Sequence, residues 1–229
     1  MATEIEIKRL LDADGFARLR AHLDGLVPAQ CQQQVNHYLD LPDAALRQAG
    51  AMLRLRAVGE RLVLTLKARA SVTHGVLHAQ ELERALATDE ERAFWQRRPL
   101  RWQDAAARIA DWLHAAGLGA LAGRDSPLLE VGNSANMRRI YRIATGIPGW
   151  PQPLTLELDH TRYPGDVDRL ELECEHADAV ALAPVLDAWL AALGVAATQA
   201  TETKYAQFLR LGAAAPLAEA GLPAAVQGA

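Results

Sequence analysis

The chain has 229 residues, of which 50% are hydrophobic, so it is long enough to bury a core in one large domain or two small ones. Its 24 basic and 28 acidic side chains leave a formal net charge of -4, without the excess of a disordered acidic chain or a general nucleic-acid binder. Two cysteines, Cys31 and Cys174, are too few for a disulfide framework, and no apolar run is long enough to span a bilayer. The first residues lack the features of a secretion signal, so we expect a cytoplasmic protein without a membrane partner.

Several short segments alternate apolar and polar residues with a period of two, which predicts strands with two chemically different faces. The dipeptide Gly59-Glu60 is typical of a two-residue hairpin turn, so the strands on either side of it should pair antiparallel. We therefore expect a mainly antiparallel sheet, with strands over residues 3–9, 35–40, 51–58, 61–68, 76–86, 134–144, 153–160 and 168–176.

Apolar residues recur at steps of three and four in four other segments, which predicts amphipathic helices over 12–26, 102–116, 179–193 and 202–211. Asp12 or Asp14 can cap the first of them. The segment 88–127 is expected to be a helical excursion between strands, of open purpose. With no repeat and no Pro/Ser linker, we expect one domain over 1–212 and a disordered Ala/Pro-rich tail over 213–229.

The charged residues of the predicted strands gather on one face. In the first strand Glu4, Glu6 and Lys8 share a face, and Ile5 and Ile7 occupy the other. One such strand would simply place its charges in solvent. The pattern recurs, however, in four further groups, which are Arg54 and Arg56; Glu81 and Glu83; Glu157 and Asp159; and Glu171, Glu173 and Glu175.

Two architectures satisfy this pattern, a sandwich with charged outer faces and a barrel with charges lining a central tunnel. A sandwich uses its apolar strand faces to pack on each other and leaves the amphipathic helices few places to bury theirs. In a closed barrel with apolar outer faces, the helices cover those faces and no sheet edge is exposed. We therefore predict a mainly β (α+β) fold, in which amphipathic helices pack outside a closed antiparallel barrel with a charged lumen.

The charges inside such a barrel indicate its ligand. An isolated buried ion is costly, so carboxylates and cations at this density need water, each other, metal ions or a charged ligand. Carboxylates at alternate positions suit Mg²⁺ or Mn²⁺, and the fixed cations Lys8, Arg54, Arg56 and Lys67 suit phosphate oxygens. We therefore expect phosphoryl chemistry on a metal-bound phosphate compound.

Other kinds of site find less support in the sequence. No Gly-rich nucleotide-binding loop and no Ser/His/Asp arrangement is recognisable. His74 and His78 are interpreted as structural or surface residues, and Cys174 as a small hydrophobic residue of the apolar face. Aromatic residues make up 5% and do not interleave with basic ones, so we expect no nucleic-acid partner.

The order and charge types of the motifs resemble the CYTH, or triphosphate tunnel metalloenzyme, superfamily. Among its members, the stretches 36–43 and 75–81 look most like those of bacterial inorganic triphosphatases. The motifs are Glu4-Ile5-Glu6-Ile7-Lys8, Tyr38-Leu39-Asp40, Leu53-Arg54-Leu55-Arg56, Leu64-Thr65-Leu66-Lys67, Glu81-Leu82-Glu83, Arg138-Arg139-Ile140-Tyr141, Glu157-Leu158-Asp159, Glu171-Leu172-Glu173-Cys174-Glu175 and Thr203-Lys204-Tyr205.

The resemblance implies an eight-stranded antiparallel barrel that binds a triphosphate together with Mg²⁺ or Mn²⁺. It implies metal ligands at Glu4, Glu6, Asp159, Glu171 and Glu173, phosphate-binding residues at Arg54, Arg56, Lys67 and Arg138, and catalytic residues at Lys8, Glu81 and Lys204. Lys8 and Lys204 would also contact phosphate, and serve either proton transfer or charge stabilisation. Glu83 is a supporting partner of Glu81 or only shares its face. Strand alternation lets only one of Arg138 and Arg139 point inward, and Arg138 fits the motif better.

The resemblance also implies a set of activities. We expect a metal-dependent hydrolase of inorganic triphosphate, or of an organic compound that ends in a triphosphate, which releases phosphate and acts as a monomer or homodimer. A thiamine triphosphatase, a class IV adenylyl cyclase and a non-catalytic module that binds polyphosphate or nucleotides are the alternatives. The chain lacks the His-Phe pair that bacterial cyclases of this type carry before the first motif, which disfavours the cyclase.

Overall fold

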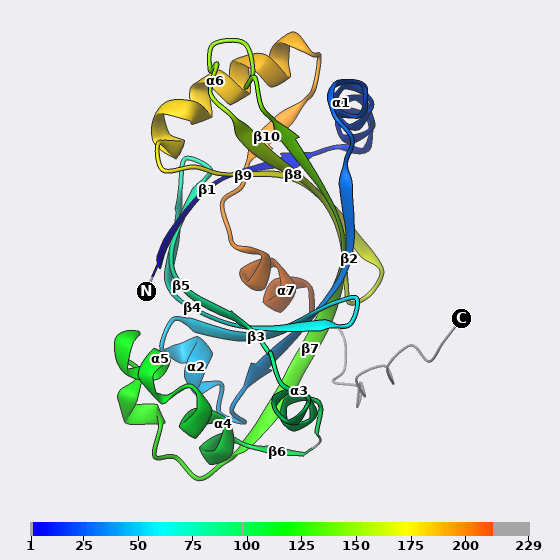
Figure 1. Cartoon of the computed structure of the whole chain (residues 1–229). Helices are drawn as coiled ribbons and strands as arrows, with labels where there is room; N and C mark the ends of the chain where they lie inside the picture. Colours follow the sequence, from blue (N-terminus) through cyan, green and yellow to red (C-terminus); the bar gives the residue numbers. More distant parts are fainter. Residues whose placement is uncertain (1, 98, 213–229) are drawn as a thin grey trace, which may run out of the picture.

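The computed structural model of the chain describes residues 2–97 and 99–212, and the tail predicted for 213–229 lies outside the described residues. Eight strands follow one another around a barrel in the order β1-β5-β4-β3-β2-β7-β8-β9, every pair antiparallel, and β9 pairs with β1 to close it (Figure 1). The strands are β1 (Ala2–Leu11), β2 (Gln30–Asp40), β3 (Ala51–Val58), β4 (Arg61–Thr73), β5 (Val76–Ala85), β7 (Pro127–Ile143), β8 (Leu154–Tyr163) and β9 (Val167–Glu175). The short strands β6 (Leu100–Arg101) and β10 (Ala197–Gln199) pair with β7 and β1 outside this ring.

The eight predicted strands are confirmed, with differences at their ends. The turn at Gly59-Glu60 joins β3 and β4, whose register starts at Val58 opposite Arg61. Strand β2 begins at Gln30 rather than at residue 35. The prediction missed its first residues because they are a run of polar residues without apolar alternation. Strand β4 continues past Ala68 through an irregularity where Arg69 has a positive φ of 54°.

The outer face of the barrel is apolar and covered by helices, as predicted. On one side α1 (Ala13–Leu26) and α6 (Ala179–Ala192) pack on β1, β8 and β9 (Figure 1). Leu19, Leu23 and Leu186 are fully buried there against Leu158 and Leu172. Asp12 caps α1, since its side chain accepts a hydrogen bond from the backbone nitrogen of Gly15 at 2.7 Å.

On the opposite side, β3 and β4 are covered mainly by residues 88–127, the excursion whose purpose the sequence left open. It forms α3 (Asp89–Gln96), α4 (Trp102–Arg108), α5 (Ala110–Ala115) and a short 3-10 helix, η1 (Gly119–Leu121), beside α2 (Ala45–Gln48). Trp95, Trp102 and Leu113 are fully buried in one cluster with the leucines of β3 and β4. The helix predicted over 102–116 is thus two helices, because Ile109 leaves helical geometry with φ -125° and ψ 22°.

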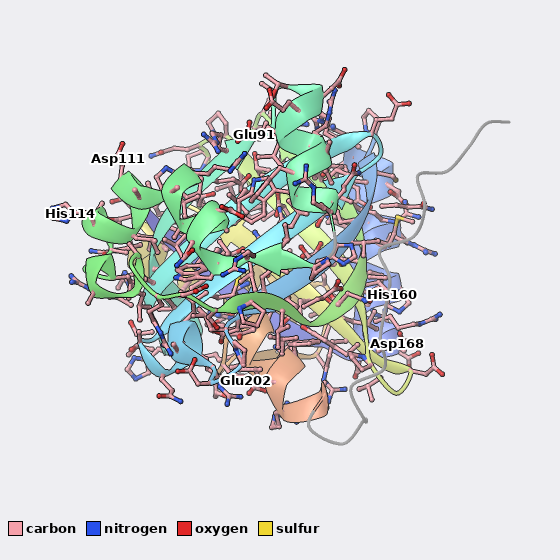
Figure 2. The ribbon with its side chains drawn as sticks, turned by 90° about the horizontal axis from the view of Figure 1, so that it is seen from below. Glu91, Asp111, His114, His160, Asp168 and Glu202 are labelled. Atoms are coloured by element: carbon pink, nitrogen blue, oxygen red, sulfur yellow. The ribbon has the colours of Figure 1, made fainter. Side chains whose placement is uncertain are left out.

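The last helix, α7 (Lys204–Gly212), lies across one end of the barrel instead of packing on its outer face (Figure 2). Its Phe208 is 2% exposed and packs among Tyr38, Met52 and Tyr163, which come from three different strands. Gly132 makes room for this ring, since a Cβ there would lie 2.8 Å from it. The helix therefore narrows one mouth of the barrel and carries Lys204 into the lumen.

The closed barrel excludes the sandwich alternative. Glu6 and Arg54, which a sandwich would expose, are each 6% exposed inside the barrel. Cys174 lies in the apolar outer cluster, as expected for a small hydrophobic residue. No helix in the described part of the chain combines the length and apolarity that a membrane crossing needs.

The packing of Phe208 predicts a large loss of stability on truncation. Phe208→Ala should lower the free energy of unfolding by about 3 to 5 kcal/mol, because removal of the buried ring leaves a cavity among its packing partners. Urea denaturation followed by circular dichroism measures the change. Phe16→Ala, at a partly buried ring of α1, is the matched control and should cost clearly less. An equal loss in both variants would contradict the assigned packing of α7.

Candidate active site

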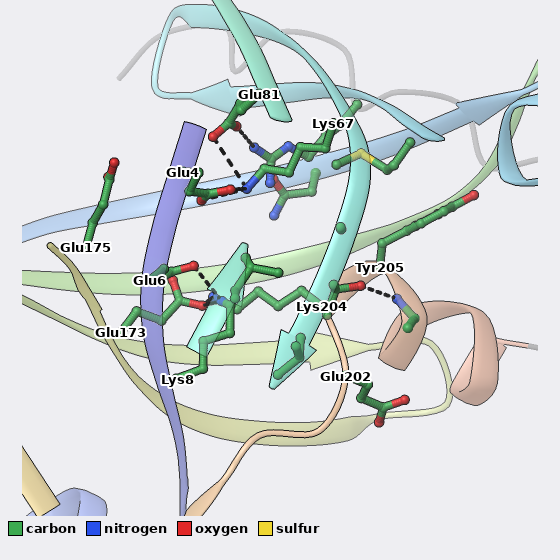
Figure 3. A pocket seen from close by; sticks show the side chains of 18 of the residues that line it. Glu4, Glu6, Lys8, Lys67, Glu81, Glu173, Glu175, Glu202, Lys204 and Tyr205 are labelled. Carbon is green, nitrogen blue, oxygen red and sulfur yellow. Dashed lines mark hydrogen bonds and ion pairs between the residues drawn. The ribbon is translucent and has the colours of Figure 1, made fainter. Parts of the chain in front are cut away.

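The barrel encloses a cavity of about 1260 Å³ whose wall is densely charged (Figure 3). Ten of the predicted site residues line it, and the other two, Asp159 and Glu171, are fully buried in its wall beside Lys204. The lining members are Glu4, Glu6, Lys8, Arg54, Arg56, Lys67, Glu81, Arg138, Glu173 and Lys204. Their roles remain predictions, but the fold brings all of them to one tunnel.

Strand register explains why these residues meet. Lys8 of β1 lies opposite Glu173 of β9, and Glu173 in turn lies opposite Glu157 of β8. Two residues further along β8, Asp159 lies between Glu171 and Arg138 on the two neighbouring strands. Because side chains alternate between faces, each of these pairs points into the lumen.

Three carboxylates on β1, β8 and β9 form the tightest acidic group in the described part of the chain. One oxygen each from Glu6, Glu157 and Glu173 lie within 4.8 Å of one another. Glu157 was missing from the predicted ligands, although it shares a strand face with Asp159 and lies directly opposite Glu173. The alternation of charge along β8 was the signal that could have found it.

The other predicted metal ligands lie apart from this group. Glu4 is paired with the Nζ atom of Lys67 at 2.6 Å. Asp159 contacts Lys204, and its Oδ2 atom lies 2.5 Å from Arg138. Glu171 accepts a hydrogen bond from the amide of Gln207 on α7 at 2.9 Å and lies 3.5 Å from Lys204. In this arrangement Asp159 and Glu171 hold cations in place.

Three largely buried cations pair with the acidic wall. Lys8 contacts Glu173 and lies 3.0 Å from Glu6, and Lys204 lies 2.8 Å from Glu173. Arg138 contacts Glu157 and reaches Glu173 at 2.6 Å. Its neighbour in sequence, Arg139, points to the exposed Cys31 on the outer face instead. The structure thus selects Arg138 as the arginine of the lumen.

The crowding shifts the protonation of these groups. Burial and the charge of Glu173 raise the pKa of Glu6 to about 8. Burial alone would raise the pKa of Glu173, but Lys204, Lys8 and Arg138 outweigh it and hold that pKa well below its usual range. Burial opposes the charge of Lys8 and Lys204, yet their carboxylate partners raise the pKa of both amines. Both lysines are therefore cations at neutral pH.

The opposite wall, on β3 and β4, carries the other cations. Arg54 donates to Thr65 at 3.2 Å and lies 3.8 Å from Glu83, while Lys67 lies 3.5 Å from Glu81. Arg56 differs, because no carboxylate in the described part of the chain lies within ion-pair distance of it. Burial and the neighbouring charges of Arg54 and Arg138 lower the pKa of Arg56 to about 10, so it stays charged at neutral pH.

Neutral amides on β2 and β7 join the two walls and were not predicted as site residues. Gln34, Asn36 and Asn136 are 3 to 5% exposed and line the same cavity. Asn36 accepts a hydrogen bond from the Nε atom of Arg56 at 3.1 Å. Asn136 donates to Asp159 at 3.0 Å. Only their shared inward position along the strands could have indicated them, since amides carry no charge pattern.

The two walls differ in what they can bind. The group formed by Glu6, Glu157 and Glu173 offers oxygen ligands only, which fits Mg²⁺ or Mn²⁺ and not a soft metal. The unneutralised Arg56 on the other side fits a phosphate oxygen. By strand order β3 lies across the barrel from β9, so one ligand in the cavity would meet both walls.

Comparison with solved structures shows the same architecture elsewhere. A Hippeastrum protein, described as a candidate adenylyl cyclase with a dominant triphosphatase activity, is 25% identical, with a TM-score of 0.74 over 91% of this chain and 96% of that one. A Bacillus halodurans protein described as a candidate adenylate cyclase is 23% identical, with a TM-score of 0.60 over 91% and 99%. A protein from Pyrococcus horikoshii OT3 is 18% identical, with a TM-score of 0.53 over 91% and 98%, and shares the fold.

Sequence comparison identifies the family. A search among curated proteins found no match. The model of the CYTH domain, however, matches residues 2–205, which spans all eight strands of the barrel and reaches into α7. The charged tunnel and this match lead to the same conclusion, that the chain belongs to the CYTH domain family.

Proposed function

We propose that the protein is a divalent-metal-dependent hydrolase of inorganic triphosphate, or of an organic compound that ends in a triphosphate. The observation that carries the proposal is the pairing of an oxygen-only carboxylate group with an unneutralised arginine across one cavity. A dication and a polyphosphate anion together would balance both walls. The triphosphatase activity described for the similar Hippeastrum protein supports the same reaction.

The proposed reaction transfers a phosphoryl group to water. Water attacks the terminal phosphorus, and the bond from that phosphorus to the bridging oxygen breaks. The bridging oxygen departs with pyrophosphate or the organic diphosphate, and the attacked phosphorus, which now carries the oxygen of water, is released as orthophosphate. Arg54, Arg56 and Lys67 bind the phosphate oxygens from one wall. Mg²⁺ or Mn²⁺ held by Glu6, Glu157 and Glu173 would supply charge neutralisation on the other.

Lys8 and Lys204 are proposed to stabilise charge and not to remove protons. Carboxylates surround both amines and raise the pKa of each, so neither is a base at neutral pH. A cation fixed in this way stabilises the charge that develops on the leaving oxygen. Glu81 is the better proton acceptor, since burial raises its pKa while it stays near Lys67 in the lumen.

A panel of substrates tests the reaction. Tripolyphosphate, thiamine triphosphate and ATP are incubated with Mg²⁺, with Mn²⁺ or with a chelator, and orthophosphate and cyclic AMP are measured. We expect metal-dependent orthophosphate from at least one compound. Cyclic AMP without orthophosphate would support the cyclase, and tight tripolyphosphate binding without turnover would support a binding module. Absence of metal-dependent orthophosphate from all three compounds overturns the proposal.

The cluster of three carboxylates predicts that losing one of them weakens metal binding. Glu157→Gln should raise the Mg²⁺ concentration needed for half-maximal rate by about tenfold or more, because one of three close oxygen ligands loses its charge. Metal titrations of the hydrolysis rate measure the change. Glu60→Gln, in the exposed turn between β3 and β4, is the matched control and should behave like the parent protein. Equal metal requirements in both variants would rule out Glu157 as a ligand.

The raised pKa of Glu6 predicts a pH dependence of metal binding. Below its pKa of about 8 Glu6 carries a proton that a metal ion must displace, so the affinity rises with pH and levels off above that value. The apparent Mg²⁺ affinity should rise about tenfold from about pH 6 to pH 7. Calorimetric titration at several pH values measures it. Glu6→Gln should bind more weakly and with a flatter pH profile, and an unchanged slope in that variant would refute the assignment.

A further inference from the structure

We propose that Asn36 and Arg56 form one phosphate-binding subsite, in which Asn36 sets the direction of the guanidinium group and adds an N–H donor of its own. The inference rests on the proposed function, because it concerns how the tunnel holds the phosphate compound. It assigns a role to an amide that carries no charge. The ligand class is a phosphate group with at least two free oxygens.

The hydrogen bonding of Arg56 is the first observation. Its Nε atom donates to the Oδ1 atom of Asn36 at 3.1 Å. Within the described residues its two terminal nitrogens have no hydrogen-bond partner, and neither is sealed off from the cavity that Arg56 lines. Binding at Nε fixes the plane of the guanidinium and leaves its outer pair of N–H groups free. That pair is the edge that grips two phosphate oxygens at once.

The other lumenal arginines are engaged differently. Arg138 uses all three side-chain nitrogens on carboxylates, with Nε and one terminal nitrogen on Asp159 and the other terminal nitrogen on Glu157. Arg54 has its Nε atom buried without a partner, and one terminal nitrogen faces Thr65. Among these three arginines, only Arg56 has its Nε atom satisfied and both terminal nitrogens free.

The residue opposite Arg56 is neutral, and this leaves the charge of the arginine available to a ligand. Asn36 of β2 lies directly across from Arg56 of β3 in the antiparallel register, so both side chains point to the same face of the sheet. A carboxylate there would also accept from Nε, but it would form an ion pair and cancel the positive charge. A neutral amide directs the guanidinium and leaves its charge available to an anion.

Asn36 also keeps a donor of its own. Its Nδ2 atom has no hydrogen-bond partner among the described residues and is not sealed off from the cavity. The neighbouring amide of Asn136 cannot serve in the same way, because its nitrogen donates to Asp159 and to Gln34 and its oxygen accepts from Thr161. Two free nitrogens of Arg56 and one of Asn36 therefore lie side by side on one wall.

A double-mutant cycle on tripolyphosphate binding tests the subsite. Calorimetry with a chelator present measures binding to the parent chain, to Asn36→Leu, to Arg56→Lys and to the double variant. Asn36→Leu should weaken binding about fivefold, the size expected from one lost hydrogen bond. In the Arg56→Lys background the same change should weaken binding clearly less than in the parent chain, because only the Asn36 donor is then lost and a lysine has no guanidinium plane to direct.

Two further variants sharpen the test. Gln34→Leu removes another lumenal amide, which contacts Gln32 and Asn136 but not Arg56, so its effect should be the same in both backgrounds. Asn36→Asp keeps an acceptor for Nε and places no apolar side chain in the lumen. It should weaken binding more than Asn36→Leu, because it neutralises the guanidinium. Thermal denaturation reports whether each variant is folded.

The outcomes separate the inference from the proposed function. Equal effects of Asn36→Leu in both backgrounds, or parent-like binding by Asn36→Asp, overturn the subsite even where hydrolysis is intact. Coupled effects on binding in a protein that hydrolyses none of the triphosphates support the subsite and overturn the hydrolase. If the parent chain does not bind tripolyphosphate in the presence of the chelator, the subsite is overturned, whereas the hydrolase is decided by the substrate panel with metal.

Discussion

The structure depends on charge pairing inside a closed barrel. Asp159, Glu173 and Lys8 are 0 to 4% exposed, and each of them would cost several kcal/mol if it were buried alone. They are tolerated because register places an opposite charge beside each one, and because Lys204 and Arg138 each contact more than one carboxylate. Because the charged faces of the strands point into the barrel, their apolar faces point outward. The hydrophobic core therefore lies between the barrel wall and the helices that cover it.

The places where pairing is incomplete are the places where a ligand can bind. Glu6, Glu157 and Glu173 lie close together, and burial together with the charge of Glu173 keeps Glu6 protonated near neutral pH. Across the cavity Arg56 has an amide where its neighbours have acids. A metal cation at the carboxylates and a polyphosphate at Arg56 would supply the missing charge partners on both walls. The charge pairing that stabilises the interior is therefore also the basis of the proposed chemistry. The helix α7 joins them, because Phe208 anchors one end of the barrel and Lys204 reaches the acidic wall from the same helix.

Much of the fold could be predicted because its information is local. The alternation of Leu53, Arg54, Leu55 and Arg56 predicts that one face of β3 is charged and the other apolar. The recurrence of that pattern, together with amphipathic helices that need an apolar surface to cover, favours an enclosed polar interior. Local sequence patterns failed to predict the structure where tertiary packing determines the backbone conformation. Ile109 belongs to a continuous helical pattern, yet it breaks the helix.

For the site, the sequence by itself determined which residue types face the lumen, because side-chain direction along a strand depends only on position. Only the tertiary structure decided which of them meet. The closure of β9 on β1 brings Glu6 and Glu173 together from opposite ends of the chain, and the pairing of β8 with β9 adds Glu157 to them. The β2–β3 register likewise places Asn36 against Arg56. Contacts between distant segments are set by register and barrel closure, and neither is encoded in the period of a single strand.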